Sequence, residues 1–413
     1  MDQMDQMDQK VFDLSDIRVL DFTWAWAGPY GTMLLAFMGA EVLKVESMAR
    51  LDHSRVRSLI AGPTYGGVNQ TGPFNELNLC KKSITVKLSD PRGIEVIKRL
   101  VKISDLVTNN FRPGVMEKLG LGYEELRKIK PDIILVSSST CGSTGPEKDY
   151  SGYAPSFSSI SGLAHLMGFS DGPPTLVGGR VDTSVGTTMA LASLAALIHK
   201  KRTGKGQYVD ISSREAMSCL IGDALVAYTL NRDVYRREGN RDEIFVPHNA
   251  YRCQGYDNWI SIAVGTEEEW QYFCRALGHP EWIRDERFLS RESRKKNEDE
   301  LDRLIAGWTS GRTDYEAMEI LQKAGVPATP MLDNEHLSED PHVQARQMFL
   351  KISHPELKER IALAPPWKTD SPGDAQIKRH APLLGEHNDY VYGKLLGMSR
   401  EEIEKLTREQ VFY

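Results

Sequence analysis

Cysteine is scarce in this chain, and the few cysteines form no framework. The 413 residues include five cysteines, which are widely spaced and form no C-x-x-C pair: Cys80, Cys141, Cys219, Cys253 and Cys274. An odd number at such spacing disfavours both a disulfide scaffold and a zinc site, and it indicates a reducing compartment. The opening MDQMDQMDQK lacks the apolar stretch of a secretory signal, so we expect residues 1–10 to be a disordered tail and the protein to be cytoplasmic.

Positive charge is also in short supply. Lysine and arginine number 51 against 57 aspartate and glutamate, which gives a formal net charge of −6. Nucleic-acid-binding proteins normally carry a basic face, so this balance disfavours a nucleic acid partner. The longest apolar stretch, Met189–Ile198, is about half the length that a membrane span needs. We therefore expect neither a nucleic acid nor a membrane partner.

Several motifs that announce a cofactor or a metal are missing. The sequence contains no G-x-G-x-x-G after its first predicted strand, and no G-x-x-x-x-G-K-[ST], G-x-S-x-G or H-E-x-x-H. These motifs bind dinucleotides, bind nucleoside triphosphates, present a serine nucleophile and bind zinc, respectively. The ten histidines show no metal-ligand spacing either. We expect no metal site.

What the sequence does contain is a regular alternation of apolar strands and helices. Ile17–Phe22 predicts a buried strand, a helix can begin at Pro29, and Glu41–Glu46 predicts a second strand. Strand, helix and strand within about thirty residues is the size of a βαβ unit. The same alternation predicts helices Ile94–Ile103, Tyr123–Lys130, Thr183–Lys201 and Ser213–Tyr228 and strands Asp105–Thr108, Ile133–Ser137 and Gln207–Ile211. It indicates an α/β fold with an open parallel sheet, in which ligands bind at the carboxyl ends of the strands.

The composition and the hydrophobic pattern of the sequence change after about Leu230. Charged and irregular stretches there enclose predicted strands at Trp259–Val264 and Val326–Met331 and a helix at Glu267–Leu277. A closing helix is predicted at Ser399–Thr407. We expect a large domain in residues 11–229, a smaller α+β domain in residues 230–331, and a C-terminal part in residues 332–413 that returns to the large domain.

Three local clusters are candidates for chemistry. Asp182 follows a glycine pair and precedes an Ala- and Leu-rich helix, so it is either a helix N-cap or an ionised carboxylate that acts as a nucleophile, and the two roles are compatible. Asn109–Gly114 follows a predicted strand, where it would contact a ligand or simply form a turn. Lys81 and Lys82 open a strand, either as a solvated edge or as a phosphate contact.

The order of these segments along the chain is more specific than any one of them. The chain carries GPYGTMLLAFMGAEVLKVE, LNLCKKSITVKL, NNFRPGVMEKLGLGYEEL, SSSTCGSTGP, RVDTSVGTTMALASLAALIHKKRTGKGQYVDIS and WISIAVGTEEEW, in that order. Together they closely resemble the family III coenzyme A transferases, which include formyl-CoA and carnitine CoA-transferases and the α-methylacyl-CoA racemases. The resemblance implies a Rossmann-like large domain from both chain ends, a smaller α+β domain from the middle, and an interlocked dimer. The implied active site lies between the large domain of one subunit and the small domain of its partner.

Matched motif by motif, Asp182 takes the position of the family's catalytic aspartate. The implied mechanism moves CoA through a mixed anhydride and an aspartyl-CoA thioester, with CoA thioesters and carboxylic acids as substrates and with no permanently bound cofactor. The positions that match the family's CoA contacts are Ala25, Trp26, Leu77, Asn78, Lys81, Asn110, Phe111 and Lys118. Lys81 and Lys118 are expected at the phosphates. Ser47 stands where many relatives have a basic residue, and Ser139 where some members have one, so phosphate recognition is expected to differ in detail.

Two other activities stay open. An acyl-CoA racemase needs a second acid–base group, because an α-proton leaves one face and returns to the other. Tyr153 stands where that branch has a histidine, which disfavours a racemase. The other alternative is a non-catalytic CoA-binding subunit of a heteromeric transferase, against which the presence of Asp182 argues. The expected partner is a second copy of the chain in a homodimer or a homologous subunit in a heteromer.

The substrates are indicated only weakly. Aromatic residues cluster near the segments that would form the site, where they would either pack the core or line a pocket for an aromatic or branched acid: Trp24, Trp26, Tyr30, Tyr150 and Tyr153. The hypothesis is succinyl-CoA as the donor and an acid such as benzylsuccinate as the acceptor, with carnitine-like acceptors less favoured. Ile244–His248, which matches a glycine-rich loop of some relatives, is not glycine-rich, so its shielding of intermediates is expected to differ.

Overall fold

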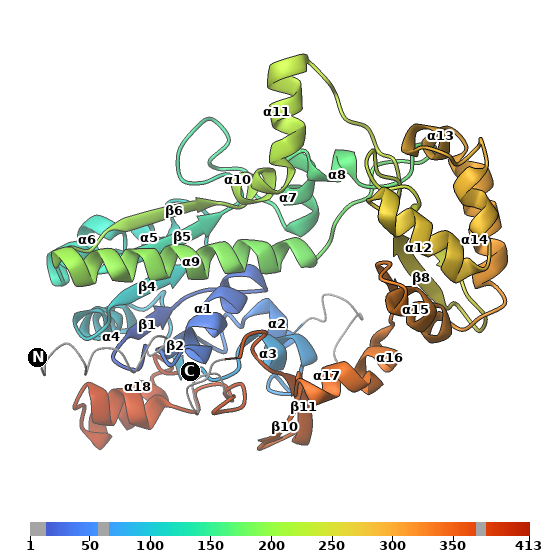
Figure 1. Ribbon diagram of the computed structural model, residues 1–413. Coiled ribbons are helices and arrows are strands. Elements are labelled where there is room, and N and C mark those ends of the chain that lie inside the picture. Colours follow the sequence, from blue (N-terminus) through green and yellow to red (C-terminus); the bar gives the residue numbers. More distant parts are fainter. Residues whose placement is uncertain (1–13, 57–65, 369–376) are drawn as a thin grey trace, which may run out of the picture. The chain divides into compact units, whose positions relative to one another are not determined.

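The computed structural model describes residues 14–56, 66–368 and 377–413, and the chain divides into two compact units (Figure 1). The larger unit comprises Met1–Ala164, Leu176–Val234 and Arg346–Tyr413. The smaller unit comprises His165–Thr175 and Tyr235–Ala345. The expected tail, residues 1–10, lies outside the described residues.

A six-stranded parallel sheet forms the centre of the larger unit. Its strand order is β3-β2-β1-β4-β5-β6. The strands are β1 (Arg18–Asp21), β2 (Glu41–Glu46), β3 (Lys82–Thr85), β4 (Leu106–Asn109), β5 (Ile134–Ser139) and β6 (Tyr208–Ser212). Each adjacent pair is parallel. The predicted α/β fold with a parallel sheet is therefore confirmed.

Alternate residues of the strands enter two apolar clusters, one on each face of the sheet. Leu20 and Leu135 belong to a cluster that contains side chains of α4 (Pro91–Lys102), α6 (Tyr123–Ile129) and α18 (Arg400–Arg408). Their neighbours Val19 and Ile134 belong to a second cluster, with α1 (Ala27–Phe37) and α9 (Arg180–Thr203). Helices thus cover both faces of the sheet, as near-continuous apolar strands require.

Helices α1 and α9 pack against each other without intervening side chains. A Cβ atom at Gly31 would lie 2.6 Å from the Gly186 carbonyl oxygen, and one at Gly186 would lie 2.4 Å from the Ala27 oxygen. Within the described residues, α9 is also the one helix long and apolar enough, by length and composition, to cross a membrane. Its close packing on α1 is that of a core helix.

The C-terminal segment belongs to the larger unit. After the hairpin β10 (Phe349–His354) and β11 (Lys358–Leu363), a π-helix at Asp389–Leu395 and α18 cover one face of the sheet. Tyr392 is fully buried and stacks on Phe412 with ring centroids 3.9 Å apart. The Lys87 N–H donates to Val411 O and the Met48 N–H to Tyr413 O, at 2.8 and 2.9 Å.

The smaller unit has its own sheet and core. Its three antiparallel strands, in the order β7-β8-β9, are β7 (His248–Arg252), β8 (Trp259–Ala263) and β9 (Ala328–Pro330). Trp270 and Phe273 of α12 (Glu267–Leu277) pack with side chains of α14 (Glu298–Thr309) and α15 (Asp314–Lys323). Thr266 caps α12 and Thr313 caps α15 through capping boxes, which fixes where each helix begins.

The predicted helix Ser213–Tyr228 is broken in the structure. Its residues form α10 (Ser213–Ser218), a 3₁₀ turn (Cys219–Ile221) and α11 (Gly222–Asn231). The break falls next to Gly222, a poor helix former, while Ile221 is held in the core. The other short helices are α2 (His53–Val56), α3 (Gly72–Leu77), α5 (Val115–Lys118), α7 (Ala154–Ile160), α8 (Leu163–Leu166), α13 (Arg291–Lys296), α16 (Asn334–Glu339) and α17 (Pro341–Ala345), with a 3₁₀ turn at Pro280–Arg284.

Candidate active site

A cavity of about 830 Å³ opens at the carboxyl ends of the parallel strands. Its walls come from the carboxyl ends of the strands and the segments after them, from β1 to β5, all in the larger unit: residues 24–27, 45–47, 49, 50, 53, 86–89, 110–113 and 138–140, with Tyr150–Tyr153 and Asp182. This is the edge at which open parallel sheets bind their ligands. A smaller cavity of about 330 Å³ shares Phe111, Arg112 and Ser139 with it.

Asp182 lies in the wall of the large cavity as the third residue of α9. The N-cap is Gly179, to whose carbonyl oxygen the Asp182 N–H donates at 3.1 Å, so the interpretation of Asp182 as an N-cap is wrong. In the described part of the chain, no residue donates a hydrogen bond or forms an ion pair with its half-buried carboxylate. Burial raises the pKa of Asp182 to about 7. A poorly solvated carboxylate without fixed donors is available as a nucleophile once it is ionised.

The segment between β1 and α1 forms the wall next to Asp182. The Trp24 N–H donates to Asn110 Oδ1, and Asn110 Nδ2 donates back to the Trp24 oxygen, both at 2.8 Å. A Cβ atom at Gly179 would lie 3.6 Å from the indole of Trp26, so that ring packs over the start of α9. The structure therefore brings together four of the predicted CoA contacts, Ala25, Trp26, Asn110 and Phe111, with Asp182.

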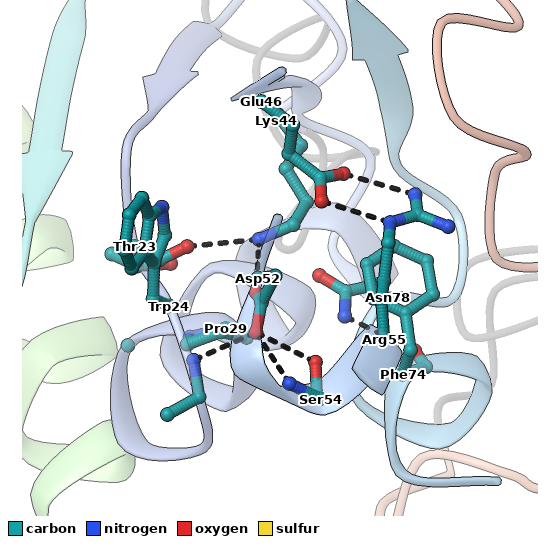
Figure 2. A network of polar contacts seen from close by, with 12 residues as sticks. Thr23, Trp24, Pro29, Lys44, Glu46, Asp52, Ser54, Arg55, Phe74 and Asn78 are labelled. Carbon is teal, nitrogen blue, oxygen red and sulfur yellow. Dashed lines mark hydrogen bonds and ion pairs between the residues drawn. The ribbon is translucent and has the colours of Figure 1, made fainter. Parts of the chain in front are cut away.

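Two buried ion pairs belong to a network of polar contacts beside this segment (Figure 2). Lys44 Nζ is 2.8 Å from Asp52 Oδ2, and Arg55 Nε is 2.8 Å from Glu46 Oε2, with all four side chains fully buried. Burial alone would raise the pKa of Asp52, but the Lys44 ammonium and hydrogen bonds from Ser54 outweigh it and hold that pKa below its usual value. The Lys44–Asp52 pair is therefore a charged part of the interior.

Lys81 has a structural place that the sequence did not predict. Its ammonium is fully buried, 3.1 Å from Asp21 Oδ2, and it donates to Pro29 O, Thr32 Oγ1 and Asn78 Oδ1 at 2.8–2.9 Å. Burial lowers the pKa of Lys81 to about 8, although Asp21 opposes that shift. A lysine whose ammonium is enclosed in this way does not contact a phosphate in this structure.

Three further predicted CoA contacts lie away from both cavities. Leu77 is buried at the end of α3, and Asn78 is the fully buried residue that ends that helix. Lys118 is exposed on α5, and it lines neither cavity, although Val115 and Leu119 on either side of α5 line the larger one. The structure does not bring Leu77, Asn78, Lys81 and Lys118 together with Asp182.

Three cations that the sequence analysis did not single out line the cavity instead: Arg50, Lys87 and Arg112. Within the described residues none of them forms an ion pair. The Arg50 guanidinium lies 4.6 Å from the centre of the Trp24 ring, and His53 meets the same ring edge-on at 5.8 Å. Arg112 and Lys87 stood in segments chosen from the sequence, NNFRPG and LNLCKKSITVKL, but no local pattern marked either side chain as a ligand contact. Arg50 stood in none of these segments.

Metal-ligating side chains do not gather in this structure. In residues 14–56, 66–368 and 377–413, no group of three or more His, Cys, Asp or Glu side chains could hold a metal ion.

The fold and the cavity agree with what comparison with known proteins finds. The model of CoA-transferase family III matches residues 14–388, and the chain belongs to this family of enzymes. Succinyl-CoA–D-citramalate CoA-transferase of Chloroflexus aurantiacus is 34% identical over 400 residues, which cover 96% of this chain and 98% of the relative. The succinyl-CoA–L-malate CoA-transferase beta subunit of the same organism is 32% identical over 403 residues, with 96% and 98% covered.

The fold has a close counterpart among solved structures. The crystal structure of a CAIB/BAIF family protein from Brucella suis superposes with a TM-score of 0.81 at 28% sequence identity. It covers 94% of this chain and 100% of that one. The resemblance to the family III CoA-transferases is thereby confirmed over nearly the whole chain.

Proposed function

We propose that this enzyme moves CoA from an acyl-CoA donor to a carboxylic acid by covalent catalysis on Asp182. The observation that carries the proposal is the half-buried carboxylate of Asp182, without a hydrogen-bond partner among the described residues, in the wall of a cavity at the carboxyl ends of the strands. A family of CoA-transferases and a nucleophile in such a cavity support the same reaction.

The proposed reaction exchanges one thioester for another without ATP. An Asp182 oxygen attacks the donor thioester carbon, the C–S bond breaks, and a mixed anhydride and CoA thiolate form. The thiolate then attacks the Asp182 carbonyl carbon, which releases the donor acid as a carboxylate and leaves an aspartyl-CoA thioester. An acceptor carboxylate repeats the two steps in reverse, so Asp182 is regenerated and no net proton is taken up.

Each attack creates an oxyanion that needs hydrogen-bond donors. The first N–H groups of α1 have no acceptor within the helix, and the Trp26 side chain makes no capping hydrogen bond to them. Ala27, the first residue of α1, lines the cavity. We assign the oxyanion to these N–H groups, which the positive end of the helix dipole reinforces.

CoA carries phosphate groups that need cations. We assign them to Arg50, Lys87 and Arg112, because these line the cavity without an ion pair among the described residues. Ala25, Trp26, Asn110 and Phe111 then contact the rest of the molecule. A guanidinium can bind a phosphate with two hydrogen bonds, which suits two of the three positions.

For the substrates we propose succinyl-CoA as the donor and a dicarboxylic acid with an aromatic group, such as benzylsuccinate, as the acceptor. The two relatives described above are named for succinyl-CoA with D-citramalate and with L-malate, which are both dicarboxylic acids. The aromatic group is supported by the side chains that line the cavity: Trp24, Trp26, Phe111, Tyr150, Tyr153 and Phe157.

The test is to trap the covalent intermediate. The protein is incubated with succinyl-CoA and hydroxylamine and digested, and the mass of the peptide that contains Asp182 is measured. We expect a hydroxamate on Asp182 that is absent from the Asp182→Ala variant, and loss of transfer by that variant of on the order of 10⁴-fold or more. An unmodified peptide with succinyl-CoA and with other acyl-CoA donors would contradict the covalent mechanism.

One feature of the cavity makes a racemase activity a second candidate function. His53 lines the same cavity as Asp182, so a second acid–base group is present although Tyr153 replaces the histidine expected of that branch. Exchange of an α-proton of an acyl-CoA in deuterated buffer, without a hydroxamate, would favour a racemase. An unmodified peptide and no proton exchange would favour a non-catalytic CoA-binding subunit.

We also propose that the active form contains a second chain, as a homodimer or as a heteromer with a homologous subunit. Helix α11 has no buried residue, and Leu225 and Leu230 are 49% and 76% exposed. Such an apolar helix is typical of a protein interface. One relative is named a beta subunit, which supports the heteromer. The mass of the purified protein by light scattering, alone and after co-expression with a homologous subunit, distinguishes the two.

A further inference from the structure

The backbone between β1 and α1 is held by two buried charged side chains (Figure 2). Lys44 Nζ donates to the Thr23 carbonyl oxygen at 2.8 Å. Asp52 Oδ1 accepts from the Ala25 N–H at 3.0 Å, and also from Ser54 N and Oγ at 2.9 and 2.8 Å. Because Lys44 and Asp52 also bond to each other, they form one clamp that spans Thr23 to Ala25.

The backbone that this clamp holds has an unfavourable conformation. Ala25 has a φ of 67°, in the left-handed region, where residues with a Cβ atom are disfavoured. Such a conformation persists only where its surroundings impose it. Here the imposing contacts are the Ala25 N–H bond to Asp52 and the two bonds between Trp24 and Asn110.

The clamp is costly in itself, because both charges are fully buried. A hydrophobic pair of the same size would give the fold equal or greater stability. It could not, however, accept a hydrogen bond from the Ala25 N–H or donate one to the Thr23 oxygen. The presence of charges here therefore indicates a need for directed hydrogen bonds to this backbone segment.

The segment held in this way forms a wall of the cavity. Trp24, Ala25, Trp26 and Ala27 line it in succession, and Ala27 O lies against Gly186 of α9, one turn after Asp182. A shift in the conformation of Ala25 would therefore move the start of α1 relative to the nucleophile.

We propose that Asp52 and Lys44 are positioning residues for CoA transfer: they impose the left-handed turn at Ala25 and thereby set the start of α1 against Asp182. This inference rests on the proposed function of the cavity. Neither side chain touches the substrates, since both lie behind the wall.

The test compares two double variants of equal charge and similar size. Lys44→Met with Asp52→Asn removes the ion pair but keeps an oxygen that can accept the Ala25 N–H, whereas Lys44→Met with Asp52→Leu removes that acceptor. Steady-state rates are measured with succinyl-CoA and an acceptor acid, such as benzylsuccinate, that the wild-type chain accepts. We expect the Leu variant to lose on the order of 100-fold in kcat with a smaller change in KM, and the Asn variant to retain at least roughly ten times more activity.

Asp105, which lies just before β4 at the amino ends of the strands, provides a matched control. Asp105 also accepts from a backbone N–H, that of Arg18, at 3.1 Å, and from a lysine, Lys200, at 3.0 Å. Asp105→Asn is expected to lower Tm without changing kcat. Equal kcat values for the Asn and Leu double variants, both folded, would overturn the proposal.

If the buried substitutions prevent folding, a second pair of variants tests the role of the turn at Ala25. Ala25→Gly permits the left-handed turn, while Ala25→Val opposes it, and Ala25 lies at the cavity wall rather than in the core. We expect kcat of the Gly variant to exceed that of the Val variant by about tenfold or more at similar Tm. Equal values would overturn the proposal.

Failure of the proposed function would be recognised separately. If the wild-type chain forms no hydroxamate and transfers no CoA, the proposed function is wrong, and binding of CoA itself then tests the clamp by calorimetry. Weaker CoA binding by the Leu double variant than by the Asn double variant would support positioning of the wall, and equal binding would overturn it.

Discussion

At Asp182, a carboxyl group lies in surroundings that oppose its charge. Burial raises its pKa to about 7, and only the ionised form can attack a thioester. Below the pKa, the ionised fraction falls about tenfold for each pH unit, so kcat/KM is expected to rise with pH up to about 7 and to level off above it. The measurement is kcat/KM from about pH 5 to pH 9, with Tm followed in parallel. A level profile through this range would contradict a raised pKa at the nucleophile.

The three cations of the cavity give a second prediction at this scale. Arg50→Ala and Arg112→Ala are each expected to raise KM for the CoA donor about tenfold, with a smaller change in kcat, because each removes a charged contact to a phosphate. Added salt should reduce the difference from wild type. Arg127→Ala is the control, since Arg127 is exposed on α6 and pairs only with Glu124 among the described residues. Unchanged KM values for both cavity variants would refute the assignment.

Single residues also show what sequence patterns can and cannot predict. Asp182 was found because a motif surrounds it. Lys81 is assigned to a phosphate by its match to a CoA contact of the family, yet its counter-charge, Asp21, lies sixty residues earlier and is brought beside it only by the fold. Arg50 was missed because an unpaired cation becomes significant only when the cavity next to it is known.

Among the elements, the contact between α1 and α9 is the most demanding. Gly186→Ala would place a Cβ atom 2.4 Å from a backbone oxygen of α1, which cannot move away as a flexible side chain would. We expect a loss of roughly 1–3 kcal/mol in the free energy of unfolding, or more, together with loss of transfer activity. Denaturant unfolding and steady-state rates measure both effects.

Gly307 provides the control for this prediction. It lies inside α14, and a Cβ atom there would meet nothing within 4 Å. Gly307→Ala should therefore raise the free energy of unfolding by about 0.5–1 kcal/mol, since alanine is the better helix former. If Gly186→Ala were equally stabilising, the close approach of α1 and α9 would be wrong.

Elements of regular periodicity were predicted well, and their limits less well. Strands β1, β2, β4 and β5 fall where short apolar runs lie, because buried parallel strands need little more than such runs. Strand β6 was also predicted, although its first three residues are not buried. The single helix expected at Ser213–Tyr228 is three pieces, since the burial of Ile221 and the propensity of Gly222 act against a continuous apolar pattern. The break in the helix is a result of tertiary packing, so no local sequence pattern predicts it.

For the whole molecule, the larger unit depends on residues from both ends of the described chain. Phe412 is only 2% exposed and packs on Tyr392 in the same cluster as β1 and α4. Phe412→Ala should lower the free energy of unfolding by about 3–5 kcal/mol. It should also weaken CoA binding, because Val411 next to it accepts a hydrogen bond from the backbone of Lys87, which lines the cavity. Thermal unfolding and calorimetry with CoA test this.

Tyr256 is the matched aromatic control. It is 95% exposed in the smaller unit, so Tyr256→Ala should change the free energy of unfolding by no more than about 0.5 kcal/mol. If Phe412→Ala behaved like this control, the C-terminal segment would not contribute to the core of the larger unit.

The hydrogen bonds from Met48 and Lys87 to residues 411–413 also have a consequence for the synthesis of the protein. A ribosome adds Met48 and Lys87 early and residues 411–413 more than three hundred residues later, after the whole smaller unit has been translated. The nascent chain therefore has the strands of the parallel sheet and Asp182 long before it has the acceptors of these two hydrogen bonds. A chain released before residue 411 is therefore expected to lack the two hydrogen bonds that Met48 and Lys87 donate.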